Sequence, residues 1–311
     1  MKRRPLRPGS LLQSSEKDRR SYWLSPLVWP PIIFAMTTIA TTTAMVADNI
    51  AIANPFIQVE LERWFEVRTL VGNATLWSPG GENNSVQQGD RFGIVGDRLI
   101  TADESRSVLS IDTSVGFIDV FENTDLQVQE LRTTGDGGKV TKLKINQGQA
   151  RLRVRPFTHD SSDLEIETPA GWSAVRGTEF GVAVHPDGKT GVATLDGMVD
   201  AYAQGQTVEV NPGFQTLIIP GEPPTEPTLI DEARATRLTP YIIEWQGSQN
   251  IRFVGNIDPV SLLIIENELQ IVERNGDFDV IISTSNNDPI EAIVVTPLGR
   301  QQSYVLALPR L

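Results

Sequence analysis

The sequence predicts an all-β protein built from two domains in succession. Short runs rich in β-branched and aromatic residues recur from Trp64 to Ile219, and glycine-containing turn signals separate them. Apolar and polar side chains alternate in residues 163–168, and large apolar residues alternate with Gly and Ala in 180–184, which is the period of a half-buried strand. No sustained helical period interrupts this region. Many short strands at such spacings predict a β-solenoid or a twisted β-sandwich for the first domain, residues 64–220.

Ten turn signals divide this first domain. Each contains a glycine, which supplies the positive φ that a tight turn needs, and most pair it with Asn, Asp or Gln. They are Gly72-Asn73, Gly80-Gly81, Gly89-Asp90, Gly96-Asp97, Asp136-Gly137-Gly138, Gln147-Gly148, Asp187-Gly188, Asp196-Gly197, Gln204-Gly205 and Pro212-Gly213.

The segment after the first domain predicts a linker and then a second β-domain. Residues 220–227 contain four prolines, which disfavour ladder pairing, so we expect a stiff linker here and a short helix over 230–238, together spanning 221–238. Six further strand-like runs separated by turn residues follow in 239–311. Their number and spacing predict a small β-sandwich of immunoglobulin-like proportions.

The amino-terminal region predicts export. Seven basic and two acidic residues stand in the first twenty positions of a chain whose formal net charge is −12, and no charged residue lies between Arg20 and Asp48. Ala51-Ile52-Ala53 then offers a small-residue cleavage site, so we expect a signal peptide over 1–53. The alternative is an uncleaved membrane anchor over 22–47. Either places the bulk of the chain outside the cytoplasm, in the periplasm or at the cell surface.

Composition removes several classes of function. The chain has no cysteine, which excludes disulfides and thiolate metal sites. Its acidic body disfavours nucleic acid, because phosphate backbones bind clusters of Lys and Arg. His159 and His185 stand far apart in the sequence and support neither zinc nor nucleophilic chemistry. We therefore expect no catalytic, cofactor or metal site, and a protein that is not an enzyme.

The segment from Thr168 to Phe180 resembles the signature of FecR-type domains, a family named for a regulator of ferric dicitrate transport. The resembling blocks extend upstream and downstream in the family's order. They include Val86-Gln87-Gln88-Gly89-Asp90, Leu99-Ile100-Thr101, Gly116-Phe117-Ile118, Leu195-Asp196-Gly197-Met198-Val199 and Val210-Asn211-Pro212-Gly213-Phe214. Several spaced blocks are more specific than one short motif.

This resemblance implies an extracytoplasmic all-β domain that senses or binds. The best-known members are single-span proteins whose cytoplasmic part controls a sigma factor and whose outer part contacts a TonB-dependent receptor. In this chain the basic head of about twenty residues is short for a helical domain with a core of its own. We expect recognition of an envelope protein; the alternatives are a structural or glycan-binding envelope component and a membrane-anchored sigma-factor regulator of iron transport.

The family motif supplies the candidate site residues, with a structural or a partner-binding role. They are Thr168, Pro169, Val175, Arg176, Gly177, Thr178, Phe180 and Gly197. Arg176 either clamps a partner's carboxylate or, as we favour, pairs with Glu165, Glu167 or Glu179 to hold the turn. Trp172 either contacts a partner or covers the end of a β-core.

Overall fold

The computed structural model describes residues 63–81, 83–113, 115–247, 250–283 and 289–306. All described residues belong to one compact unit, Gln58–Leu311. The predicted signal peptide over 1–53, or anchor over 22–47, lies outside them. The described residues include no helix that would be long and apolar enough to span a bilayer.

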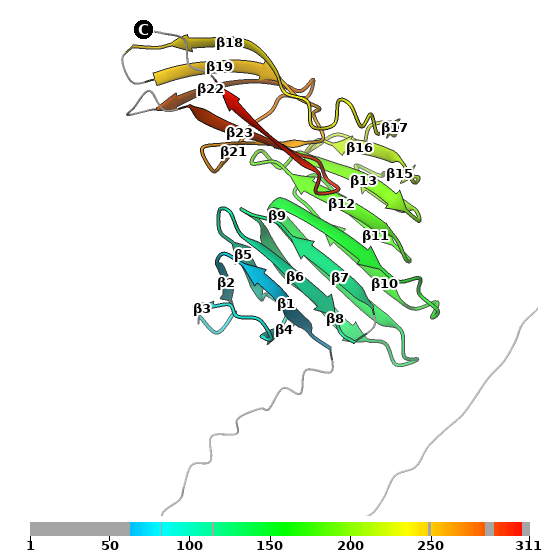
Figure 1. The fold of residues 1–311 in the computed structure, drawn as a ribbon. Coiled ribbons are helices and arrows are strands. Elements are labelled where there is room, and N and C mark those ends of the chain that lie inside the picture. The colour runs from blue at the N-terminus through cyan, green and yellow to red at the C-terminus, as the bar shows by residue number, and fades with distance from the viewer. Residues whose placement is uncertain (1–62, 82, 114, 248–249, 284–288, 307–311) are drawn as a thin grey trace, which may run out of the picture. The chain divides into compact units, whose positions relative to one another are not determined.

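The prediction of an all-β fold is confirmed, because the described residues form 24 strands and no α-helix. The first seventeen strands belong to one hydrogen-bonded network, which we call the first sandwich (Figure 1). They are β1 (Phe65–Val71), β2 (Ala74–Trp77), β3 (Asn83–Ser85), β4 (Arg91–Phe92), β5 (Arg98–Thr101), β6 (Arg106–Ile111), β7 (Gly116–Val120), β8 (Asp125–Thr133), β9 (Lys139–Val154), β10 (Asp163–Glu167), β11 (Trp172–Val175), β12 (Glu179–Val184), β13 (Thr190–Asp196), β14 (Val199–Ala203), β15 (Gln206–Val210), β16 (Phe214–Ile218) and β17 (Thr228–Leu229).

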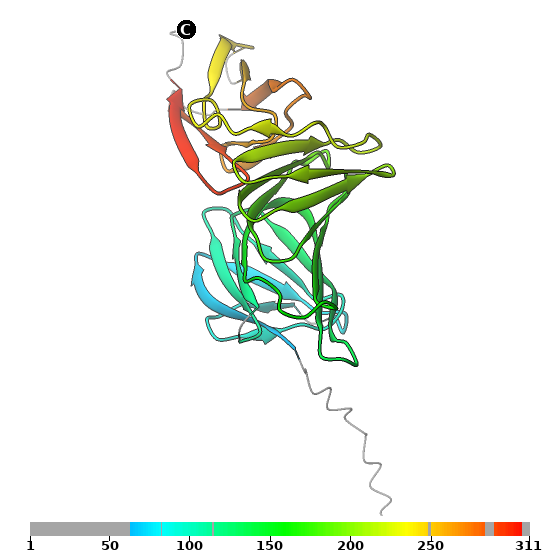
Figure 2. The ribbon, with the colours of Figure 1, turned by 90° about the vertical axis from the view of Figure 1, so that its right-hand side faces the viewer.

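The pairing registers divide this network into two sheets. The first sheet has the order β4-β1-β6-β7-β9-β12-β13-β16-β17, and the second has the order β3-β2-β5-β8-β9-β10-β11-β14-β15. Inward side chains of both sheets share one apolar core, in which Phe65, Leu109, Leu143 and Phe180 are fully buried. Of the two predicted architectures, the two-layered sandwich is the one that forms (Figure 2).

The long strand β9 belongs to both sheets. Residues 139–147 pair with β8 in the second sheet, whereas residues 148–154 pair with β7 and β12 in the first. The change occurs at Gly148, whose positive φ of +89° is a conformation that glycine adopts without strain. Thr124 packs so closely against Gly148 that an ideal Cβ there would lie 2.5 Å from the Thr124 Cα. Gln147-Gly148 is therefore a bend inside a strand, unlike the other nine predicted turns, which lie between strands or at their ends.

The last seven strands form a second sandwich. They are β18 (Thr239–Trp245), β19 (Asn250–Asn256), β20 (Leu262–Ile265), β21 (Glu268–Gln270), β22 (Asp277–Ser283), β23 (Ile290–Val295) and β24 (Gln301–Leu306). A three-stranded sheet, β18-β19-β22, faces a four-stranded sheet, β21-β20-β23-β24. Between them lies a separate apolar core that includes Phe253, Leu263, Phe278 and Val294.

The segment between the sandwiches differs from the predicted linker and helix. Thr225 holds the proline-rich stretch against β16, because its N–H donates to the Leu217 carbonyl at 2.9 Å and its hydroxyl accepts the Leu217 N–H at 3.0 Å. Residues 232–236 form turns, and no helix forms over 230–238, so the short helix predicted there is wrong. The Asp231 carboxylate accepts the Ala233 N–H at 3.0 Å and the Asp231 carbonyl accepts the Ala235 N–H at 2.8 Å, which makes one capped turn, and Pro240 disfavours helical backbone at Thr239.

The second sandwich covers part of the outer face of the first sheet. Ala183 of β12 packs there against Leu262, Ile264 and Val295 from the outer face of the four-stranded sheet. Gln149 of β9 adds hydrogen bonds from its Nε2 to the carbonyls of Thr296 at 2.5 Å and Pro297 at 3.0 Å. The remaining part of that outer face lies beyond this contact and carries the candidate site.

Candidate functional site

The family motif lies where the chain crosses between the two sheets of the first sandwich. Residues 176–178 carry the chain from β11 of the second sheet to β12 of the first, and residues 197–198 carry it back from β13 to β14. Thr178, Gly197 and Met198 of these two crossings lie in contact with one another.

Gly177 is required by the backbone at the first crossing. Its φ of +119° lies in the region that side chains rarely adopt, and an ideal Cβ at this position would overlap the Cα of Pro156. Pro156 belongs to a third connection between the sheets, the one from β9 to β10. Gly177 therefore allows two inter-sheet connections to touch.

Thr178 and Gly197 join the two motif crossings. The Thr178 hydroxyl donates to the Met198 carbonyl at 3.0 Å, and the Thr178 carbonyl accepts the Val154 N–H at 3.0 Å. A Cβ on Gly197 would lie 2.6 Å from the Gly177 carbonyl oxygen. The side chain of Thr178 is almost fully buried. These contacts explain a Thr and two glycines at these positions without any ligand.

The other apolar and small motif residues also make contacts within the fold. Thr168 closes the turn before β11 through a 2.7 Å bond from its N–H to the Gly171 carbonyl, and its hydroxyl meets that of Thr190 at 3.0 Å. Pro169 lies against Gly188 of the β12–β13 hairpin. Val175 and Phe180 are buried in the core of the first sandwich.

Arg176 is the only charged residue of the motif, and its side chain is exposed. Its Nη2 donates to the carbonyl of Asp160 at 3.3 Å. The favoured expectation of a pair with Glu165, Glu167 or Glu179 is wrong. Over the described part of the chain those carboxylates contact Lys142 at 2.7 Å, Lys144 at 2.8 Å and Arg151 at 2.5 Å, respectively, and each of these cations lies on a neighbouring strand.

Trp172 does not cover the end of a β-core, which was one of its two predicted roles. It projects half-buried from the second sheet and stacks on Tyr202, its cross-strand neighbour in β14, with ring centroids 4.8 Å apart and an interplanar angle of 26°. The pair covers the sheet's surface rather than the end of its core.

Three large apolar side chains are exposed around the motif crossings. Phe117, Leu195 and Met198 are 38%, 48% and 45% exposed. A hollow of about 230 Å³ lies beside Arg176 and Met198, and another of about 320 Å³ lies beside Phe117 and Arg153, and both share Gly177 and Thr178 as walls. We call the surface made by Phe117, Arg153, Arg176, Leu195 and Met198 the crossover patch.

Charged groups of both signs border the crossover patch. The Arg153 guanidinium lies over the Phe117 ring at 5.8 Å and contacts Asp119 at 3.5 Å. In the smaller hollow, burial first and then a hydrogen bond with Glu165 raise the pKa of Asp163. Such a surface offers apolar contact, an exposed guanidinium and carboxylates, which suits binding.

The histidines lie away from the crossover patch. His159 Nε2 is 2.9 Å from the Asp136 carbonyl, and His185 is fully buried at the β12–β13 hairpin. Over the described ranges, no group of three or more His, Asp or Glu side chains is placed to hold a metal ion.

Sequence reasoning missed the apolar members of the crossover patch as site residues. The alternation in β7 was a usable signal, because Ile118 and Val120 face the core and the same period places Phe117 on the outer face. Leu195 and Met198 stand next to the Asp196-Gly197 turn, where no periodicity reports exposure.

Three comparisons relate this chain to known proteins. Residues 97–200 match the family model described as FecR protein. A search of the curated proteins finds no match.

Among solved structures, two crystal structures of a candidate anti-sigma factor from Parabacteroides distasonis are similar in fold. They are 11% and 12% identical to this chain with TM-scores of 0.36 and 0.37, and the alignments cover 44% and 46% of this chain. This chain covers 61% of the first structure, less than two thirds of its length, and 68% of the second. A polysaccharide lyase structure aligns at 8% identity with a TM-score of 0.20, covering 79% of this chain and 40% of the lyase.

Proposed function

We propose that the chain is a non-catalytic module that recognises a protein partner outside the cytoplasm, in envelope sensing or signalling, because residues 97–200 match the FecR family model. The crossover patch is the surface we assign to this recognition. The observation that carries the assignment is that Arg176, the only charged residue among the eight motif residues, leaves its side chain exposed and lines a hollow together with the exposed Met198.

The chemistry of the crossover patch supports a protein partner. Protein interfaces are enriched in aromatic side chains, Met and Arg, and a few such residues near the centre carry most of the binding energy. Phe117, Met198, Arg153 and Arg176 are of these kinds. The two hollows between them offer recesses for a partner's side chains, and Asp163 and Asp200 at the rim favour a partner with complementary cations.

The location outside the cytoplasm rests on the amino-terminal sequence. A basic segment, an uncharged stretch and a small-residue site before Asn54 follow the order of an export signal. The absence of cysteine from the sequence is compatible with an oxidising compartment, where unpaired thiols are a liability.

The second sandwich is assigned to the immunoglobulin-like class as part of this proposal. Its seven strands pair as first-second-fifth and fourth-third-sixth-seventh in chain order. Immunoglobulin domains are likewise seven-stranded antiparallel sandwiches with cross-connected strands, although their constant-type domains place the fourth strand in the other sheet. Modules of this kind present surfaces for binding.

Photocrosslinking in the native cell tests the proposed recognition. A benzophenone amino acid at Leu195 or Met198 is expected to capture one envelope protein, and Arg176→Glu is expected to abolish that product. The same group at Val71, an exposed apolar residue of β1 in the same sandwich, is the matched control. Equal capture from Val71, or capture that survives Arg176→Glu, would remove the crossover patch as the recognition surface.

A glycan-binding role has one observation in its favour. The Trp172–Tyr202 stack stands on the outer face of the second sheet beside Glu167 and Thr207, its cross-strand neighbours, and sugars bind proteins through aromatic faces with adjacent polar groups. Retention on purified cell-wall glycan that is lost in Trp172→Ala would support this role. Wild-type protein that passes through such a column unretarded would exclude it.

A further inference from the structure

The two edges of the three-stranded sheet in the second sandwich are protected unequally. At one edge, β18 contains Pro240 and a register shift between Pro240 and Ile242. Both features discourage another strand from pairing. At the other edge, β22 pairs with β19 over all seven of its residues without a register shift and contains no proline and no lysine. Over the described residues, its outer edge has no partner strand.

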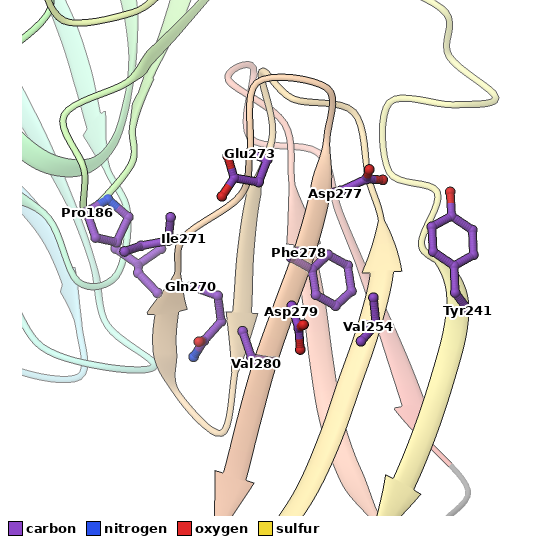
Figure 3. A pocket seen from close by; sticks show the side chains of 11 residues that line it. Pro186, Tyr241, Val254, Gln270, Ile271, Glu273, Asp277, Phe278, Asp279 and Val280 are labelled. Atoms are coloured by element: carbon purple, nitrogen blue, oxygen red, sulfur yellow. The ribbon is translucent and has the colours of Figure 1, made fainter.

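A hollow of about 640 Å³ opens beside this unprotected edge (Figure 3). Phe278 and Val280 of β22 form one side of it, and Leu269 of β21 with Ile271 forms the other. Ile271 is 55% exposed, and Ile281, the next residue of β22, is 64% exposed. A strand edge with exposed isoleucines beside an apolar hollow has the two features that strand addition uses, free backbone hydrogen-bonding groups and recesses for alternate side chains.

The charges at one end of the hollow are predominantly negative. Figure 3 shows Glu273 and Asp277 at the end where the chain enters β22. The Asp277 carboxylate accepts bonds only from amides, those of Asn256 at 2.8 Å and Asn275 at 2.6 Å. Glu273 lies near Lys189, a cation that also contacts Asp187 at 3.8 Å.

The cations near the hollow are already engaged. Arg252 makes two bonds to Asp279, at 2.9 Å and 2.6 Å, and so neutralises that carboxylate. Lys189 is buried and donates to the carbonyl of Val272. Four carboxylates, those of Asp187, Glu273, Asp277 and Asp279, thus stand against the two cations Lys189 and Arg252, so a Lys or Arg from outside would meet an excess of negative charge.

We propose that β22 binds an extended segment of a partner protein as an added strand, with apolar side chains in the hollow and a Lys or Arg beside Glu273 and Asp277. The charge pattern favours such a segment over a second copy of this chain, since β22 contains no Lys or Arg that an added copy could place beside Glu273 and Asp277. This surface lies on the second sandwich and is independent of the crossover patch.

Binding of defined peptides to the whole protein tests this proposal. The probe is a nine-residue fluorescent peptide that alternates Val with Lys, and the matched peptide carries Glu in place of Lys. Fluorescence anisotropy is expected to show binding of the Lys peptide at least tenfold tighter than that of the Glu peptide. The double variant Glu273→Lys/Asp277→Lys is expected to reverse this preference, and Ile281→Lys to weaken binding of both peptides.

Two variants serve as controls. Val305→Lys changes an equally exposed residue on β24, an edge strand of the other sheet, and is expected to leave the affinity within twofold of wild type. Leu195→Asp alters the crossover patch and is expected to have no effect. Equal affinity for the two peptides, a wild-type preference in the charge-reversed protein, or an equal loss in Val305→Lys would overturn the proposal. A dimer in solution that Ile281→Lys dissociates would also overturn it, because a second copy would then occupy the edge.

Discussion

The outer face of the first sheet has a covered half and an open half, and the same strands contribute to both. In the covered half β12 and β13 present Gly181, Ala183, Gly191 and Ala193 to the second sandwich. In the open half these two strands and their neighbours present larger side chains. These include Phe117, Arg153, Glu179, Leu195 and Asp196.

The difference in side-chain size between the two halves follows from what packs against each half. An ideal Cβ on Gly181 would overlap the carbonyl of Pro297, and one on Gly191 would overlap the carbonyl of Val260. Small residues on the covered half let the backbone of the second sandwich approach the sheet directly. The open half has no such requirement, and its large side chains remain available for a partner.

The largest expected effect comes from adding a side chain to the covered half. Gly181→Val places atoms where the Pro297 carbonyl lies, so we expect the free energy of unfolding to fall by about 3 kcal/mol or more. Urea denaturation measures this change. Asp196→Val, on the neighbouring strand in the open half, is the control and is expected to stay within about 0.5 kcal/mol. Similar losses in the two variants would contradict the division of the face.

A second effect is expected from pH, at the hairpin that reaches from the covered half toward the second sandwich. Burial, followed by the nearby charge of Lys189, lowers the pKa of His185 from its ordinary 6.5 to about 3, while the backbone of Pro259 acts in the opposite direction. Below pH 6.5, His185 binds a proton in the unfolded chain but stays neutral in the folded protein until the pH approaches 3. Stability should therefore fall as the pH drops from 6.5 toward 3, by about 1.4 kcal/mol per pH unit from this group.

The variant His185→Phe isolates this contribution. Between pH 6.5 and 5, its unfolding free energy should depend less on pH than that of wild type. Parallel curves for wild type and His185→Phe would show that His185 does not remain neutral in the folded protein.

A smaller effect is expected at the polar contact of the covered half. Gln149→Ala leaves the carbonyls of Thr296 and Pro297 without their donor in a buried position, which should cost about 1–2 kcal/mol of unfolding free energy. Gln129→Ala, whose amide bonds only to Gln127 among the described residues, should change stability by less than about 0.5 kcal/mol in the same denaturation experiment. A neutral Gln149→Ala would mean that apolar packing alone holds the second sandwich in place.

The smallest effect on stability, but the clearest on function, is expected in the open half. Leu195 is 48% exposed, so Leu195→Asp should change the unfolding free energy by no more than about 0.5 kcal/mol. In the native cell the same substitution should remove the crosslink formed from Met198. A large loss of stability would instead identify Leu195 as a packing residue.

Part of the contact between the sandwiches was visible in the sequence. Residues 262–265 of β20 are all apolar, without the alternation of a half-buried strand, and the structure buries them on both faces. The alternation of Gly and Ala with larger apolar residues in 180–184 carried the matching signal. Neither pattern identifies the segment against which it packs, because the contacting segments are far apart in the chain. Gln149 and its acceptor Thr296, for example, are 147 positions apart.

The candidate site was predicted in position but not in chemistry. The motif residues were recognised, and the contacts of Gly177, Thr178 and Gly197 follow from the crossing of connections that only the folded sheets bring together. Arg176 was paired with nearby acids on the basis of sequence distance. In the structure those acids form ion pairs with Lys142, Lys144 and Arg151, since cross-strand neighbours are closer than neighbours along a turn.

By itself, the sequence determined the all-β class, nine of the ten turns and the FecR resemblance of the first sandwich. These follow from local rules, the two-residue period of a strand and the conformational freedom of glycine, which act within a few residues. Only the tertiary structure decided which outer faces are covered, where Arg176 points and which edge of the second sandwich is left unpaired. Those outcomes depend on contacts between segments far apart in the chain, and strand periodicity reports only which side chains face the core.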